Sequence, residues 1–238
     1  MDPRLKHEIE HGRKIASYAE AAWGWSGRIG GLRWERRVRM LVEGLKPGDR
    51  VLEVGCGTGL LTAELARTGA KVYSLDISQD LLKQAKDKCE DKSIVFFCSS
   101  AYELGFRDRS FDHVIGMSVL HHLDIDRALK EFSRVLKDGG HLAFSEPNML
   151  NPHIFAERTF LRERFHNSPD ETAFVRFSLG RKVRGYGFKE ISITPFDFLY
   201  PKLPASMAGF FSKVSGVIER VPVLSEFAGS LFIRARKP

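Results

Sequence analysis

The chain has 238 residues and a net charge of +7, and 43% of its residues are hydrophobic and 28% charged. This composition predicts a globular domain and excludes a disordered chain. No run of about 18 uncharged apolar residues occurs, so no membrane-spanning helix is predicted. The charge is +4 over residues 1–50, −3 over 51–150 and +6 over 151–238. Such basic flanks can attract anionic partners, although solvated surface is the simpler interpretation.

Residues 1–47 are predicted to form a helical cap. Apolar residues recur at helical spacing in two sets, one ending at Trp23 and one running from Val38 to Leu45. Between them, residues 23–31 are rich in tryptophan and glycine, which predicts a flexible joint. A cluster of cations follows, from which one arginine could contact a substrate carboxylate or phosphate: Arg33, Arg36, Arg37 and Arg39.

Residues 48–147 alternate between short apolar runs and amphipathic helical patterns. Strands are predicted at 50–54, 71–75, 94–97, 111–117 and 141–144, and helices at 60–68, 78–89 and 124–136. Strand–helix alternation of this kind indicates a parallel sheet with helices on both faces.

Residues 148–238 have a different texture, and we expect them to form the substrate side of a single domain covering 1–238. Two last strands are predicted, at 188–194 and 230–235. An amphipathic helix at about 205–221 is predicted as an insertion between them. Packing of this helix on its own domain is favoured, and peripheral contact with a membrane surface is the alternative.

The strongest motif is the glycine loop after the first strand, VLEVGCGTG at residues 51–59. Glycine lets a backbone turn tightly and lets a ligand touch main-chain atoms. A dinucleotide fold wants G-x-G-x-x-G, whereas this loop is G-x-G-x-G and follows Glu53. A carboxylate at Glu53 suits a cationic amino group better than a pyrophosphate, which disfavours a nucleotide-dependent oxidoreductase.

Asp76 ends the second predicted strand, 17 residues after Gly59. A carboxylate at this place accepts hydrogen bonds from the two ribose hydroxyls of a nucleoside. The glycine loop and Asp76 together therefore predict a nucleoside site at the carboxyl edge of the sheet.

Together these segments resemble the class I S-adenosylmethionine-dependent methyltransferases, from about Gly48 to Pro147. Residues 99–112, SSAYELGFRDRSFD, resemble the family stretch GDAxxLPFxDxSFD. Residues 119–123, VLHHL, and 136–140, LKDGG, resemble the family's VLHHL and LKPGG segments. Within that family, the sequence segments most resemble those of the small-molecule members that methylate quinone precursors.

The resemblance implies an α/β fold, a doubly wound, seven-stranded, mostly parallel sheet with the last strand antiparallel. It also implies S-adenosylmethionine as cofactor. Glu53 would hold its ammonium group, the loop would approach its methionine part, Asp76 would bind its ribose and Met117 would lie below its sulfonium. The implied cofactor residues are Glu53, Gly55, Cys56, Gly57, Gly59, Asp76, Ile77, Ser100, Ala101, Tyr102 and Met117. Ser100 departs from the family, which often has Asp there as acceptor for the adenine amino group.

A hydroxyl or carbon nucleophile must lose a proton, so a base near it would help. The candidate catalytic residues are His121, His122 and Glu146, all after strands at the ligand-binding edge. Plausible substrate contacts are Tyr18, Trp34, Asn148, Phe155 and Tyr200, because aromatic walls fit an apolar or planar molecule. No metal site is predicted.

The sequence thus favours methyl transfer to a small, apolar or lipid-like molecule on oxygen or carbon. An RNA or protein methyltransferase using the basic flanks is an alternative. The N/D-P-P-Y/F motif of enzymes that methylate base amines is missing at Met117 to Leu120, which disfavours a nucleic-acid substrate. A non-catalytic scaffold that binds the cofactor is the third hypothesis. The three cysteines, an odd number, predict no disulfide framework and a cytoplasmic protein.

Overall fold

The computed structural model describes residues 2–161, 168–200 and 203–238. Its centre is one seven-stranded sheet with the order β3-β2-β1-β4-β5-β7-β6. The strands pair in parallel from β3 to β5, while β7 runs antiparallel to both β5 and β6, which confirms the predicted fold. The strands are β1 Arg50–Val54, β2 Lys71–Asp76, β3 Ile94–Cys98, β4 Phe111–Met117, β5 Leu136–Pro147, β6 Lys189–Phe196 and β7 Ser230–Arg236.

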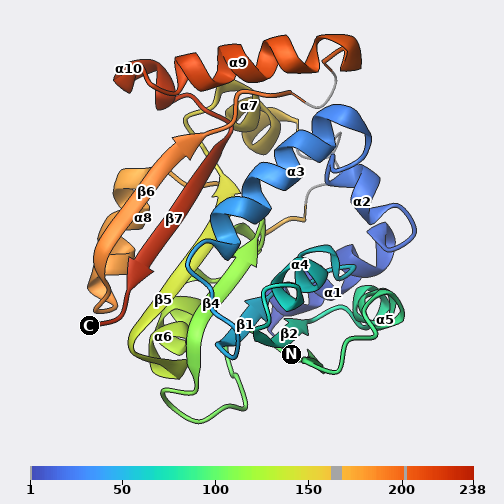
Figure 1. Cartoon of the computed structure of the whole chain (residues 1–238), viewed down its shortest axis with the longest axis vertical. Coiled ribbons are helices and arrows are strands. Elements are labelled where there is room, and N and C mark those ends of the chain that lie inside the picture. The colour runs from blue at the N-terminus through green and yellow to red at the C-terminus, as the bar shows by residue number, and fades with distance from the viewer. Residues whose placement is uncertain (1, 162–167, 201–202) are drawn as a thin grey trace.

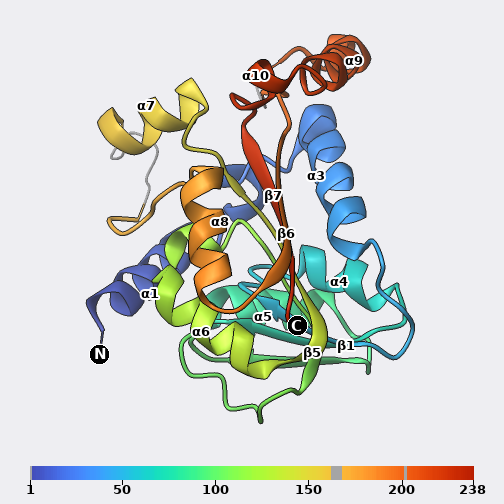
Figure 2. The same cartoon turned by 90° about the vertical axis from the view of Figure 1, so that its left-hand side faces the viewer.

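Helices cover both faces of this sheet (Figures 1 and 2). The α-helices are α1 Pro3–Ile15, α2 Ala19–Ala22, α3 Gly27–Val42, α4 Leu60–Ala66, α5 Gln79–Lys88, α6 Ile125–Val135, α7 Pro152–Phe160, α8 Arg176–Gly185, α9 Ala208–Ile218 and α10 Pro222–Ser225. Two 3-10 turns are η1 Leu120–His122 and η3 Ala205–Met207.

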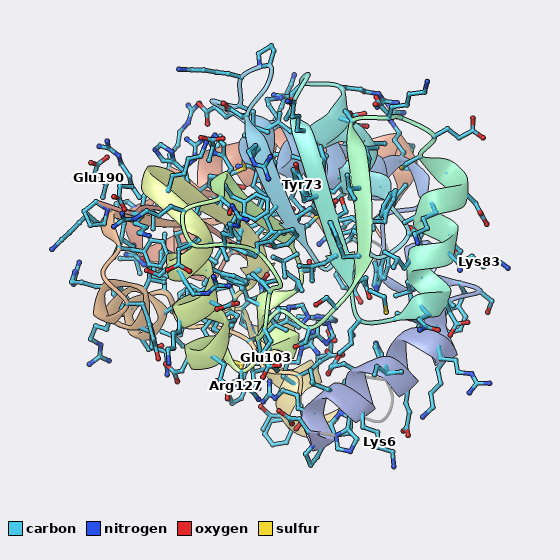
Figure 3. The ribbon with its side chains drawn as sticks, turned by 90° about the horizontal axis from the view of Figure 1, so that it is seen from below. Lys6, Tyr73, Lys83, Glu103, Arg127 and Glu190 are labelled. Carbon is cyan, nitrogen blue, oxygen red and sulfur yellow. The ribbon has the colours of Figure 1, made fainter. Side chains whose placement is uncertain are left out.

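Two apolar layers form the core. On one face, Leu41 of α3 and Leu65 of α4 pack against strand residues such as Val51. On the other, Phe132 of α6 and Leu179 of α8 pack in a cluster that also includes Tyr73 of β2 (Figure 3). The central strands, such as β1 and β4, are therefore buried between two helical layers, as runs of apolar residues in parallel strands require.

The N-terminal cap differs from the predicted flexible joint. Helix α3 already begins at Gly27, so Gly30 and Gly31 lie inside it. A Cβ on Gly30 would come within 2.6 Å of the Trp25 carbonyl carbon. The glycine at this position thus allows α3 to pack closely on the backbone of the segment that joins it to α2, and the joint prediction is wrong for residues 27–31.

Strand β5 also begins earlier than predicted, at Leu136 instead of His141. Leu136 pairs with Phe111, and the register shifts between Phe111 and His113. The LKDGG segment, which precedes the predicted strand at 141–144, therefore extends the strand across an irregularity.

The arginine cluster of α3 is used within the protein. Arg33 and Arg37 both contact the Asp197 carboxylate, at 2.9 and 2.7 Å. Arg36 pairs with Glu219 just beyond α9. These ion pairs join α3 to the β6–α9 region. Three of the four arginines that were considered as contacts for a substrate anion are therefore paired with carboxylates of the protein itself.

The insertion before β7 folds as η3, α9 and α10 and lies over the end of α3 (Figure 1). Ala208 and Phe211 pack with Ile29 of α3, which agrees with the expected packing on the domain. Within the described residues, no helix is long and apolar enough to cross a membrane.

Candidate active site

A cavity lies where β1, β2, β3 and β4 end, and it brings together residues that are far apart in the chain. Its wall includes ten of the eleven predicted cofactor residues: Glu53, Gly55, Cys56, Gly57, Asp76, Ile77, Ser100, Ala101, Tyr102 and Met117. Gly59 is not part of the wall; it precedes α4 in the left-handed conformation and packs against α5. The ten residues come from four strand ends, which is where open α/β sheets bind ligands.

The glycine loop has no side chains at Gly55 and Gly57, where its backbone borders the cavity. Gly55 has φ +69°, and a Cβ there would lie 2.4 Å from Val119 Cγ2. A larger residue would therefore be strained and would collide with a neighbour. A bare loop of this kind leaves main-chain atoms within reach of a ligand.

Glu53 is buried in the cavity wall, with an exposed fraction of 1%. Its Oε2 accepts hydrogen bonds from Thr62 Oγ1 and Ser74 Oγ, both at 2.6 Å. Its Oε1 is buried and has no hydrogen-bond partner among the described residues. Burial raises the pKa of the Glu53 carboxyl to about 7. An orphaned carboxylate oxygen at this place fits a ligand that brings a cationic donor.

Asp76 ties the glycine loop to the second strand. Its Oδ2 accepts from Gly57 N and its Oδ1 from Ser78 N, each at 2.8 Å. Burial raises the pKa of Asp76 while these backbone donors oppose the shift. A carboxylate offers about four acceptor sites, so capacity for two ligand hydroxyls remains. The donor set around Asp76 therefore fits a ribose.

Next to Asp76, the cavity wall is formed by the segment after β3, which includes Ser100 and Tyr102. The Ser100 hydroxyl accepts a hydrogen bond from Tyr102 N at 3.2 Å. The Tyr102 hydroxyl accepts from Asp124 N at 2.8 Å, and the Arg127 guanidinium lies 4.2 Å from its ring centroid. Ser100 thus has a local partner where the family often has a carboxylate.

The three candidate catalytic residues occupy two layers. His122 lines the cavity, whereas His121 and Glu146 lie behind it with exposed fractions of 5% and 1%. Glu146 accepts hydrogen bonds from Val119 N and Leu120 N at 2.9 Å and contacts His121 Nδ1 at 2.7 Å. Burial raises the pKa of Glu146 to about 7 and lowers that of His121 well below its usual value.

Of the candidate substrate residues, Trp34 is in the cavity wall, where its ring meets that of Trp25 edge to face at 5.6 Å. The structure places the others away from the cavity. Asn148 is buried and donates to two carbonyls near α10, and three aromatics are exposed by 47%, 45% and 38%: Tyr18, Phe155 and Tyr200.

Helix α1 supplies wall residues that sequence reasoning missed, among them Glu8 and His11. The helix packs across α5, where a Cβ on Gly12 would lie 2.6 Å from Ser78 Cβ. Gly12 within a helical pattern was the one local sign that this helix approaches another closely.

Comparison with known proteins agrees with this geometry. Residues 52–144 match the family model described as a methyltransferase domain. A demethylmenaquinone methyltransferase of Corynebacterium glutamicum is 38% identical over 116 residues, which cover 48% of this chain and 47% of the relative. The chain thus spans about half the length of the curated relatives it matches.

Solved structures share the fold over nearly the whole chain. An S-adenosylmethionine-dependent methyltransferase of Thermotoga maritima superposes with a TM-score of 0.71 at 19% identity, covering 96% of this chain and all of the other. The N-methyltransferase NodS of Bradyrhizobium japonicum, in complex with S-adenosyl-L-homocysteine, has a TM-score of 0.68 at 15% identity, with coverages of 98% and 99%. Residues 52–144 are thus similar to a methyltransferase domain, and the whole chain shares its fold with S-adenosylmethionine-dependent methyltransferases of known structure.

Proposed function

We propose that this protein transfers a methyl group from S-adenosylmethionine to oxygen or carbon of a small, apolar or lipid-like molecule. The observation that carries the proposal is one cavity in which the unpartnered Glu53 Oε1 and the Asp76 carboxylate flank a bare glycine loop. The lipid-like substrate class draws support from the relative named demethylmenaquinone methyltransferase and from the tryptophans of the wall.

In this proposal each part of the chain has one task. Glu53 holds the ammonium group, Asp76 the ribose, and residues 48–147 bind the cofactor as a whole. The cofactor supplies a methyl group on a sulfonium, which is its own leaving group. The helical cap of residues 1–47 excludes water, and residues 148–238 complete the substrate side of a single domain.

His122 is the candidate proton acceptor because it alone of the three lines the cavity. Its Nδ1 lies 2.8 Å from Glu8 Oε2, a carboxylate that orients the ring. Glu146 and His121 act in this proposal as positioning residues that fix η1 beneath the cavity.

A transfer assay with labelled methyl donor over a cell extract tests the function. We expect label in the organic-extractable fraction, and calorimetry to detect binding of S-adenosylmethionine and S-adenosylhomocysteine but not NAD. Label in RNA or protein would favour the alternative that uses the basic flanks. Cofactor binding without any transfer would favour a scaffold, and binding of NAD alone would refute the cofactor assignment.

Cofactor binding is expected to weaken as the solution becomes acidic. With a pKa of about 7, the Glu53 carboxyl is mostly protonated below that pH and must lose a proton to hold an ammonium group. The affinity should therefore fall by about tenfold between pH 7 and pH 5.5. Calorimetry in buffers of different ionisation enthalpy measures the released proton. Glu53→Gln should bind more weakly at pH 7 and show a flat profile; an equally steep profile in that variant would refute the contact.

The outer face of α9 supports peripheral contact with an anionic membrane. Exposed apolar side chains follow helical spacing on α9 and beside its two ends: Met207, Phe210, Val214, Val217 and Val221. Lys213 and Arg220 are exposed neighbours of this face. Burying such a face beside cations favours a lipid surface of opposite charge. We expect the protein to float with anionic liposomes, Phe210→Asp to lose flotation and Ser212→Asp to keep it. A wild type that stays at the bottom of the gradient excludes the contact.

A further inference from the structure

Histidines and carboxylates from three separate segments meet at one side of the cavity. Glu8 and His11 come from α1, His121 and His122 from η1, and Glu171 from the segment before α8. One donor atom each from His121, His122 and Glu171 lies within 4.8 Å of the others. His122 Nδ1 is 2.8 Å from Glu8 Oε2 and 3.7 Å from Glu171 Oε1, and His11 Nε2 is 3.8 Å from the same Glu171 oxygen.

The two carboxylates are held from behind by other groups. Ser168 Oγ donates to Glu8 Oε1 at 2.5 Å, which leaves Glu8 Oε2 turned to His122. Arg158 pairs with Glu171 Oε2, while Oε1 accepts from Ser168 N at 2.8 Å and faces the histidines. In each carboxylate one oxygen is thus held by a neighbouring side chain and the other faces a histidine, and in Glu171 this second oxygen also accepts from Ser168 N.

His121 is oriented in the same way. Its Nδ1 lies 2.7 Å from Glu146 Oε2, and this carboxylate also accepts from backbone donors, so Nδ1 carries the proton. The lone pair is then on Nε2. A carboxylate behind a histidine in this manner fixes the tautomer and strengthens the ring as a metal ligand.

The ring of His122 faces the carboxylate of Glu8. Its buried Nδ1 makes no hydrogen bond of regular geometry, although Glu8 Oε2 lies only 2.8 Å away. The two atoms lie side by side, close enough to be ligands of one ion.

We propose that His121, His122 and Glu171, with Glu8 as fourth ligand, bind one divalent transition-metal ion of the Zn²⁺ class. Two imidazoles and two carboxylates are a donor set that zinc accepts, with ligand atoms at about 2.0–2.2 Å from the ion and therefore about 3.3 Å from one another. The observed separations of 2.8 and 3.7 Å lie on either side of this value. The ligand atoms of His121, His122 and Glu171 lie within 4.8 Å of one another, so the set closes by an inward movement of side chains.

An ion here would border the cavity, because His122 and Glu8 both line it. It would fasten α1 to η1 as a closed, four-ligand structural site. Binding of the ion does not rest on the proposed methyl transfer. His122 would then be a ligand in place of a proton acceptor, so the two roles exclude each other and metal titration decides between them.

Calorimetry of the chelator-treated full chain with Zn²⁺ tests the site, with Co²⁺ as a spectroscopic probe. We expect one ion per chain and intense visible absorption of four-coordinate Co²⁺. His122→Ala and Glu171→Gln should each weaken binding at least 100-fold, while Glu146→Gln should weaken it by about 10–100-fold by acting through His121.

His141→Ala is the matched control, because His141 is exposed and its ring stacks on His113 at 5.6 Å, away from the cluster. It should keep full affinity. Binding of S-adenosylmethionine, measured on the same samples, reports whether each variant is folded and keeps the two proposals separate. If the wild type binds the cofactor but no Zn²⁺, or if His122→Ala and His141→Ala bind Zn²⁺ equally well, the metal site is refuted and the methyltransferase proposal stands.

Discussion

Asp76→Ala is expected to weaken binding of S-adenosylmethionine by about 100-fold. Hydrogen bonds from the two ribose hydroxyls to a buried carboxylate would be lost, and each such charged bond contributes about 1.5–3 kcal/mol. The substitution also leaves Gly57 N and Ser78 N without their acceptor, so the glycine loop loses its tie to β2. Calorimetric titration at pH 7.5 measures the change.

Two controls separate loss of the contact from loss of the fold. Asp80→Ala removes an exposed carboxylate four residues away on α5 and should bind normally. Asp76→Asn keeps one acceptor oxygen and should fall between the two. Unchanged affinity in an Asp76→Ala protein with native circular dichroism would contradict the ribose role.

The parts of this site that could be predicted from the sequence are local. A buried strand, a glycine turn and a helix specify where Gly55 lies, and a second strand ending at Asp76 must reach the same edge in a parallel sheet. This local pattern specifies Glu53, the glycine loop and Asp76, whereas the remaining cofactor residues came from the family resemblance. Ten of the eleven predicted residues line one cavity. The backbone conformations of the strand, the glycine turn and the following helix are determined by residues only a few positions apart in the sequence.

The parts that could not be predicted depend on packing between distant segments. Glu8 and Glu171 are separated by 163 positions in the sequence, yet both face His122. No spacing rule relates them, so the sequence contained no metal-ligand pattern and none was predicted. The arginines of α3 show the same limit, since Asp197, which binds Arg33 and Arg37, lies more than 150 residues beyond them.

Glu146→Ala is expected to lower the free energy of unfolding by at least about 3 kcal/mol, because several buried donors lose their acceptor at about 1–3 kcal/mol each. The carboxylate accepts from Val119 N, Leu120 N and His121 N and contacts the His121 ring nitrogen. Alanine also leaves space that water can fill only in part. Urea denaturation followed by circular dichroism measures the loss.

The comparison with two other substitutions identifies the cause. Glu146→Gln retains an oxygen for Val119 N and Leu120 N, and neutral His121 can change tautomer to accept from the new amide, so most stability should remain. Glu103→Ala removes an exposed carboxylate (Figure 3) and should change the free energy by less than about 0.5 kcal/mol. If Glu146→Ala is as stable as Glu103→Ala, then η1 is not held by this carboxylate. The two histidines must then be positioned by α1 and the segment around Glu171, and both proposals for His122 would depend on those contacts alone.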